Sequence, residues 1–342
     1  MTVIDIHAHY VPQQWPALAG TPPRPTLRVD GPRDATIMLG SQEFRRIDDA
    51  SWNADKRLED MDTHGIDLQV MSPTPVFFSY EQHPDAATQV ASIFNDLALD
   101  IAAQGEGRLL PFCQVPLQDT DAACAELDRC LDAGHVGVEI GNHVGDRDLD
   151  DAGIVTFLQH CADRDVPVFI HPWDMPNGPR LDRWMAQWLV GMPSETHLSI
   201  LALILGGVFD RVGPELRLCF AHGGGSFPFW IGRMDNAWQH RNDIIGTSAL
   251  PPSGYLDRFS VDTLVFDHAP LRMLIDTMGA DRVMLGSDYP YPLGEQNIGE
   301  LVRTAGLDSS VHDRILGRNA ELFLGARSAS ALQGISAAAG AV

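Results

Sequence analysis

The chain has 342 residues, 46 of them acidic and 24 basic, which gives a formal net charge of −22. This charge argues against nucleic acid as a partner, and the apolar stretch at residues 200–208 is too short to span a bilayer. The five cysteines form no CxxC motif, and the N-terminus has no signal-peptide pattern. We therefore expect a cytoplasmic protein with reduced thiols and no membrane association.

Apolar runs typical of buried strands alternate with helix-like segments along the chain. Strands are expected at residues 3–9, 67–71, 109–115, 136–140, 166–170, 216–221, 259–261 and 282–287. Helices are expected between them at residues 54–64, 85–104, 120–133, 151–163, 193–212, 227–241 and 269–278. This alternation indicates βαβ units in an α/β protein, and one (β/α)8 TIM barrel accounts for residues 1–342 as a single domain.

Two segments fall outside the alternation. Residues 10–53 are punctuated by Pro and Gly and carry short strand-like pieces, so we expect a small insertion subdomain after the first strand, covering the barrel mouth. The end of the chain is rich in Ala, Ser and Gly. After C-terminal helices, we expect a flexible tail at about residues 328–342.

The first expected strand carries two histidines, His7 and His9, separated by one residue. Side chains alternate along a strand, so both imidazoles point to the same face. Neutral imidazole is a good ligand for zinc and related ions, so this pair is half of a metal site. Taken alone the pair is a weak signal, because two such residues also occur as satisfied polar groups at a strand end.

Three later strands also end on side chains of ligand type, namely His171, His222 and Asp288. Catalytic residues of a parallel α/β barrel lie where strands end and loops begin. A single histidine at a strand end is more often structural than functional. Four such endings in one chain favour a metal-dependent active site.

These motifs resemble the decarboxylase branch of the amidohydrolase superfamily, over nearly the whole chain. The similar stretches are VPLQD at 115–119, HPWDM at 171–175, WLVGMPSET at 188–196, FAHGGGSF at 220–227 and LGSDYPYPLGE at 285–295. The resemblance implies one divalent metal, usually zinc, bound by His7, His9, His171 and Asp288. It also implies that His222 is the catalytic acid/base, with Asp288 counted beside it among the catalytic residues.

The resemblance further implies how substrate is bound. Arg45, Arg233 and Arg241 are the candidate partners of substrate carboxylates, because the planar guanidinium binds carboxylate in a bidentate way. Trp184 is a candidate for the aromatic lining of the site, although core packing explains it equally well. In relatives the helix arginine comes from the neighbouring subunit, so a homodimer with Arg233 reaching the partner's site is implied.

The residue types fit a non-oxidative decarboxylation, and the resemblance implies that the substrate is a ring-cleaved aromatic catabolite, a small dicarboxylate semialdehyde. Water on a divalent ion with these ligands ionises near neutral pH. Hydroxide adds to the conjugated substrate, the carbon bearing the carboxylate is protonated, and CO2 leaves as the hydroxide is expelled. The alternative is a metal-dependent hydrolase of the same superfamily that opens a lactone or amide ring. Glu139 on the fourth strand stays without an assigned role.

Overall fold

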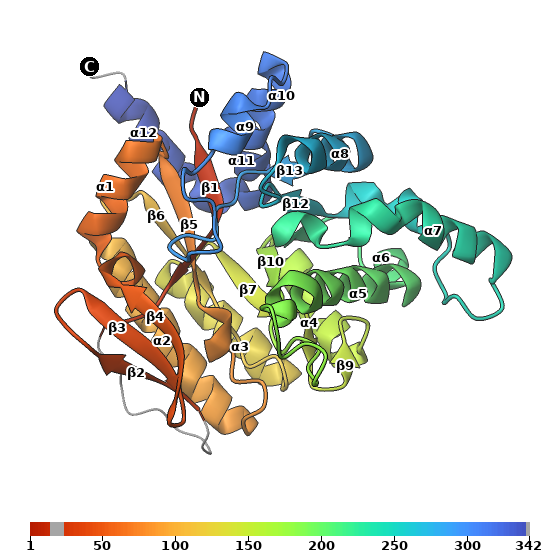
Figure 1. Ribbon diagram of the computed structural model, residues 1–342, viewed down its shortest axis with the longest axis horizontal. Coiled ribbons are helices and arrows are strands. Elements are labelled where there is room, and N and C mark those ends of the chain that lie inside the picture. The colour runs from red at the N-terminus through yellow and green to blue at the C-terminus, as the bar shows by residue number, and fades with distance from the viewer. Residues whose placement is uncertain (14–23, 340–342) are drawn as a thin grey trace.

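The computed structural model describes residues 1–13 and 24–339 and contains a parallel eight-stranded sheet that curls into a barrel (Figure 1). In spatial order the strands are β1 (Ile4–Tyr10), β5 (Leu68–Pro73), β6 (Leu109–Cys113), β7 (Gly137–Gly141), β10 (Pro167–His171), β11 (Arg217–Phe220), β12 (Ser260–Asp262) and β13 (Val283–Met284). The barrel closes through backbone hydrogen bonds from residues 285–289 to β1, such as Asp288 N to His7 O at 2.8 Å. The predicted TIM-barrel class is confirmed.

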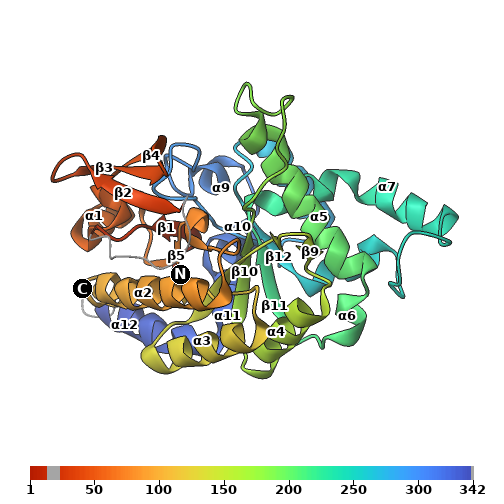
Figure 2. The same cartoon turned by 90° about the horizontal axis from the view of Figure 1, so that it is seen from below.

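Helices follow the strands as a βαβ pattern requires and cover the outside of the sheet (Figures 1 and 2). The main ones are α1 (Ala54–His64), α2 (Pro84–Ala103), α3 (Thr120–Ala133), α4 (Ala152–Asp163), α5 (Met192–Leu205), α6 (Val208–Arg211), α7 (Phe227–His240) and α8 (His268–Met278). Short polar residues begin several of them: Asn53 caps α1 and Asp119 caps α3 by accepting hydrogen bonds from backbone N–H groups. Expected and observed bounds agree closely for α1 to α4.

The structure differs from the sequence prediction in the helix expected at residues 193–212. That segment divides into α5 and α6, because Gly207 between them adopts a left-handed backbone with φ of 69°. A π-helical turn, Gln187–Gly191, precedes α5. By length and composition the stretch Gln187–Leu205 could cross a membrane, and 39% of its most apolar window is buried inside the protein. Ile200, Leu203 and Ile204 of α5 belong to the apolar core.

The C-terminal end is also more regular than expected. Beyond α9 (Glu300–Thr304), α10 (Ser309–Asp313) and α11 (Asn319–Leu324), residues 329–339 form helix α12 (Ala329–Ala339) rather than an irregular tail. Its Leu332 and Ile335 pack against a cluster formed by Phe323 with residues of β1, β5 and β6. The alanines therefore make helix, and the apolar side chains between them give it a surface to pack on. Residues 340–342 lie outside the described residues.

The insertion after β1 contains an antiparallel sheet of β2 (Pro25–Val29), β3 (Asp34–Leu39) and β4 (Gln42–Asp48). Residues 14–23 of the insertion lie outside the described residues. Phe44 of β4 packs against Trp173, two residues beyond the end of β10, with ring centroids 6.0 Å apart. The hairpin therefore lies beside the loops at the carboxyl ends of the strands, where a barrel places its active site.

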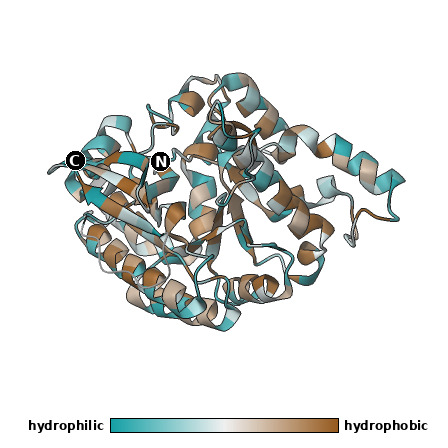
Figure 3. Ribbon diagram, turned by 60° about the horizontal axis from the view of Figure 1, so that its bottom comes forward, coloured by the Kyte–Doolittle hydropathy of each residue, from teal (hydrophilic) through white to brown (hydrophobic). Residues whose placement is uncertain are grey.

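The apolar core runs between the sheet and the surrounding helices, and the strands read as hydrophobic segments in the ribbon coloured by hydropathy (Figure 3). A second cluster closes the opposite, amino-terminal end of the barrel, where Ile4 and Ile6 pack with Phe112 and with Phe323 of α11. Side chains fill the amino-terminal end of the barrel, so the carboxyl-terminal end is the open one. The histidines of β1 lie at this carboxyl-terminal end.

Candidate active site

Three imidazoles converge at the carboxyl ends of β1 and β10. Each has its Nδ1 beside an acceptor: Asp262 Oδ2 at 2.7 Å for His7, Pro73 O at 3.3 Å for His9 and Pro172 O at 2.9 Å for His171. A proton on each Nδ1 leaves each Nε2 with a free lone pair. The Nε2 atoms of His7 and His9 are only 3.1 Å apart, and His171 Nε2 is buried with no hydrogen-bond partner.

Asp288 completes this group from the segment that closes the barrel. Its carboxylate Oδ1 lies 3.2 Å from His9 Nε2 and 3.6 Å from His7 Nε2. One ligand atom from each of His7, His9, His171 and Asp288 falls within 4.8 Å of the others. Lone pairs that face each other, together with the unpartnered Nε2 of His171, fit one divalent cation between them. The predicted ligand set is therefore brought together by the fold.

The electrostatics of the group also suit a cation. Burial lowers the pKa of His9 to about 4 and that of His171 well below its ordinary value, so both are neutral at pH 7. Burial alone would raise the pKa of Asp288, but the neighbouring imidazoles of His9 and His7 hold it below its ordinary value. Burial opposes protonation of His7 as well, yet Asp262 and Asp288 outweigh it and raise its pKa. A bound cation takes the place of that proton.

His222 lies at the turn after β11 and faces the same group. Its ring centroid is 5.3 Å from that of His7 and 5.0 Å from that of His171. Its backbone is left-handed, with φ of 56°, and its Nδ1 is buried without a partner. Burial, followed by the neighbouring His7, lowers the pKa of His222. A neutral imidazole with a free nitrogen at this place can accept a proton.

Asp262, the last residue of β12, is a site residue that the sequence analysis missed. It is fully buried, and besides His7 it accepts hydrogen bonds from the backbone N–H groups of His222 at 3.0 Å and Gly223 at 2.8 Å. The signal in the sequence is the same as at the other strand ends, a ligand-type side chain directly after an apolar run. The strand predicted at residues 259–261 is short, and in the structure it extends by one residue to Asp262.

Arg45 lies at the edge of the site, above Tyr291. Its guanidinium carbon is 4.3 Å from the centroid of the Tyr291 ring, a stacking that attracts a cation. The other neighbour of that ring is His9, with centroids 5.5 Å apart, and the Tyr291 hydroxyl bonds Thr74. Arg45 thus sits one aromatic ring away from a metal ligand. Tyr291, which the sequence analysis left out, holds it there.

The other predicted substrate-binding residues are not brought to the histidines within one chain. Arg233 is exposed on α7, which projects away from the barrel in both ribbon views (Figures 1 and 2). Arg241, just beyond α7, is exposed and pairs with Asp243 at 3.0 Å. Trp184 is 74% exposed, and Arg183 stacks on it at 4.3 Å.

Glu139 of β7 is fully buried beside His9, with Oε1 3.9 Å from His9 Nδ1. Neither of its carboxylate oxygens has a hydrogen-bond partner. Burial raises its pKa well above the ordinary value, and the charge of Asp288 adds to that effect. A neutral carboxyl group is therefore favoured at this position, and it is not among the four converging ligands.

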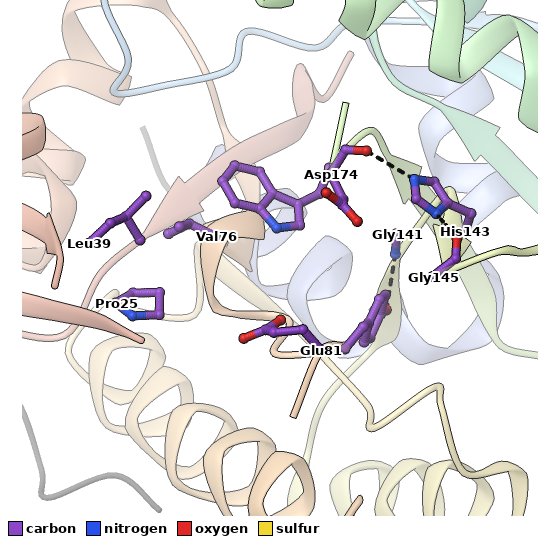
Figure 4. Close-up of a pocket in the computed structure, with 10 residues that line it drawn as sticks. Pro25, Leu39, Val76, Glu81, Gly141, His143, Gly145 and Asp174 are labelled. Atoms are coloured by element: carbon purple, nitrogen blue, oxygen red, sulfur yellow. Dashed lines mark hydrogen bonds between the residues drawn. The ribbon is translucent and has the colours of Figure 1, made fainter. Parts of the chain in front are cut away.

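A cavity of about 290 Å³ opens at the carboxyl ends of β7 and β10 (Figure 4). Trp173 forms one wall, and Gly141, which pairs with His171 in the sheet, lies at its floor. The insertion contributes Pro25 and Leu39. The volume approaches the lower end of the range for small-molecule sites, but none of His7, His9, His171, His222 and Asp288 lines this cavity.

The chain matches the family model described as Amidohydrolase over residues 4–326, and it belongs to that family. Its relatives show that it falls in the decarboxylase branch of that family. It is 38% identical over 328 residues to 2-amino-3-carboxymuconate-6-semialdehyde decarboxylase of Dictyostelium discoideum, an alignment that covers 94% of this chain and 91% of the relative.

Solved structures agree with this placement. IDCase of Metarhizium anisopliae in its apo form superposes with a TM-score of 0.81 at 25% identity, covering 94% of this chain and 97% of that one. A 5-carboxyvanillate decarboxylase of Novosphingobium aromaticivorans complexed with manganese gives a TM-score of 0.71 at 25% identity, covering 79% of each chain. The predicted carboxy-lyase branch is confirmed, and the hydrolase alternative finds no support among these relatives.

Proposed function

We propose that this chain is a metal-dependent, non-oxidative decarboxylase of 2-amino-3-carboxymuconate 6-semialdehyde or a closely related ring-cleaved aromatic catabolite. One observation carries the proposal. Three Nε2 lone pairs and one carboxylate oxygen converge beside His222, whose own Nδ1 is buried and unpartnered. That arrangement combines a cation site with a neutral base, and the similarity to the Dictyostelium decarboxylase over 94% of the chain supports the substrate.

We propose zinc as the native metal, one ion per chain. His7, His9, His171 and Asp288 offer imidazole nitrogen and carboxylate oxygen, which are ligand types that zinc takes in proteins, and a further position on the ion would be open to water or substrate. Cobalt and manganese accept the same ligand types, and a neighbouring decarboxylase structure contains manganese. A divalent ion held by this set would supply a Lewis acid and lower the pKa of a nearby water.

His222 would move the proton that the reaction requires. Loss of CO2 from an unsaturated carbon is unfavourable, because the electron pair left behind cannot delocalise. In the proposed reaction His222 takes a proton as hydroxide adds to the conjugated substrate, and it then delivers that proton to the carbon bearing the carboxylate. The C–CO2 bond breaks next, and its electron pair forms the new double bond as hydroxide leaves. Burial favours the neutral imidazole of His222, which can accept the first proton, and the imidazolium that results is acidic enough to return it.

Arg45 would orient the substrate for these steps. Its guanidinium lies over Tyr291, one ring from His9, and can bind a carboxylate through two parallel N–H groups. In a protein with a net charge of −22 the overall field repels a dicarboxylate. The attraction therefore has to come from a local cation such as this one.

We propose a homodimer in which Arg233 reaches the neighbouring site, with Arg241 as a further candidate. Large apolar side chains are exposed on adjacent parts of the surface, at the π-helical turn, α5 and α7; they are Leu189, Val190, Leu198, Phe229 and Trp230. Helices α5 and α7 also contact each other. An apolar surface of this kind on a soluble enzyme favours a protein partner, and a second copy would cover it.

The proposed reaction is tested by following the near-ultraviolet absorbance of the substrate together with CO2 release, with metal-loaded protein. Loss of absorbance with an equal amount of CO2 is expected, whereas ring opening of a lactone without CO2 would favour the hydrolase. His222→Ala should abolish turnover and leave the metal content unchanged. Loss of the metal in that variant would make His222 a ligand instead of the base.

The shared site is tested by mixing two inactive variants, His222→Ala and Arg233→Ala. In a mixed dimer one site would contain both groups intact, so mixing should restore part of the activity. Specific activity of the wild type should also fall on dilution below the dimer dissociation constant. If subunits demonstrably exchange and mixing restores nothing, Arg233 does not act across the interface.

A further inference from the structure

The carboxylate of Asp262 connects two parts of the site that come from opposite ends of the chain. Oδ2 accepts a hydrogen bond from His7 Nδ1 at 2.7 Å and from the His222 backbone N–H at 3.0 Å. Oδ1 accepts from the backbone N–H groups of Gly223 at 2.8 Å and Leu264 at 3.1 Å. Three of these four donors are backbone N–H groups. The fourth is the imidazole of His7, which can carry its proton on either ring nitrogen.

Three backbone N–H donors favour the ionised form of the Asp262 carboxylate, which can only accept hydrogen bonds. His7 then holds its proton on Nδ1 and presents Nε2 to the group formed with His9. Gly286 adds to this constraint, because a Cβ placed on it would lie 2.8 Å from the Asp262 Cβ and 2.9 Å from the His7 Cβ. The two side chains are therefore packed closely, with little room to separate.

We propose that Asp262 is a positioning residue that fixes the Nδ1–H form of His7 for metal binding and, through the same carboxylate, fixes the turn that carries His222. The inference rests on the proposed metal site at His7. A metal ligand whose second nitrogen bonds a carboxylate is both oriented and made more basic. Here the same carboxylate also fixes the backbone of the proposed base, so the metal ligand and the base share one support.

The substitution Asp262→Asn separates this role from simple structural support. Asparagine keeps the shape, and its Oδ1 can still accept from Gly223 and Leu264, while its Nδ2 faces His7. An amide N–H donates to His7 Nδ1, which moves the imidazole proton to Nε2 and removes the metal's lone pair. In the opposite orientation of the amide, the backbone N–H groups of Gly223 and Leu264 would both face the amide nitrogen, which is itself a donor. That orientation is therefore less favourable.

The experiment measures binding of Zn2+ and Mn2+ to metal-free protein by competition with a chelating dye. Asp262→Asn should bind metal about 10- to 100-fold more weakly than wild type, and at least as weakly as Asp262→Ala. A purely structural role predicts the reverse order, because Asn preserves more of the hydrogen bonds than Ala does. Wild-type affinity in Asp262→Asn, or a much larger loss in Asp262→Ala than in Asp262→Asn, would overturn the proposal.

A matched control is Glu126→Gln, at a buried carboxylate that accepts from Asn95 at 2.7 Å and Arg129 at 2.8 Å, away from the site. It should lower the free energy of unfolding and leave metal affinity unchanged. The wild-type protein offers a second test that needs no variant: the 15N shifts of His7 in the metal-free chain should show the Nδ1–H form. The Nε2–H form would overturn the proposal even if the chain proves to be a decarboxylase, while a wild type that binds no metal would count against the proposed function alone.

Discussion

Gly225 is the position in the site where a single methyl group should do the most damage. It follows the His222 turn with φ of 61° and ψ of −130°, a conformation open to glycine and closed to other residues. A Cβ built there would lie 2.3 Å from the backbone oxygen of Pro193 and 3.0 Å from Thr196 Cβ. The Pro193 oxygen cannot simply move away, because it accepts a hydrogen bond from Ser226 N at 3.2 Å.

The expected loss for Gly225→Ala follows from these terms. The unfavourable backbone costs about 1–3 kcal/mol, and forcing the clash apart costs about 1–3 kcal/mol more. Reduced freedom of the unfolded chain returns up to about 1 kcal/mol. The net destabilisation is about 1–6 kcal/mol, centred between 3 and 4 kcal/mol. Because the strain acts on the turn that carries His222, activity at a temperature where the variant is folded should fall as well, with metal content unchanged.

Urea unfolding and steady-state decarboxylation measure the two effects. Gly334→Ala is the matched control: Gly334 lies inside helix α12 and a Cβ there meets no atom within 4 Å. That variant should be as stable as wild type or up to about 1 kcal/mol more stable, since alanine is the better helix former. The reasoning fails if Gly225→Ala and Gly334→Ala unfold at the same denaturant concentration, or if the first keeps full activity.

Three further outcomes follow from the structure. Asp288→Ala should lower both bound metal and activity, as metal analysis of the purified variant will show; a fully metallated variant would remove Asp288 from the ligand set. Arg45→Ala and Arg233→Ala should each reduce kcat/KM by about 2–4 kcal/mol of transition-state stabilisation, whereas Arg46→Ala, whose side chain is 84% exposed, should behave as wild type. Burial lowers the pKa of His135 to about 4, whereas a value of about 6.5 is expected in the unfolded chain. The unfolded state therefore binds a proton more readily than the folded state. As a result, the free energy of unfolding falls as the pH drops from about 7 to about 4. Between pH 7.5 and pH 5 the wild type should lose about 2 kcal/mol more than His135→Asn does, and equal losses by urea unfolding would contradict this.

The sequence predicted the barrel and the ligand set because both depend on local patterns. Strands that are buried on both faces read as apolar runs, and the residue just after each run marks the active end of the barrel. His7, His9, His171, His222 and Asp288 could all be read in this way, and the resemblance to the amidohydrolase decarboxylases then distinguished the four ligands from His222. Asp262 was missed because β12 has only three residues, Ser260–Asp262, too few for a clear period.

Other features could not be read from the sequence because they depend on packing between distant segments. The stacking of Arg45 on Tyr291 joins residues 246 positions apart along the chain, on an insertion and on the closing segment of the barrel. Helix α12 packs against the apolar cluster at the amino-terminal end of the barrel. Composition alone does not show this contact, which is why it predicted a flexible tail. Trp184 was expected in the site lining, yet it is mostly exposed within one chain.

The arrangement of cations explains why a dicarboxylate would need more than one chain. Arg45 is placed beside the converging ligands and can bind one carboxylate, and the metal site offers positive charge for the reacting end. Arg57 is also close, but its guanidinium is fully buried and occupied by Gln69 Oε1 at 2.8 Å and by the backbone oxygen of His9. It therefore supports β1 and is not available to substrate. A second carboxylate must find its cation elsewhere, and the exposed Arg233 lies on the same helix as the apolar side chains Phe229 and Trp230, which a second copy would cover. In the proposed homodimer, a second copy would cover the exposed apolar surface and Arg233 would supply the second cation.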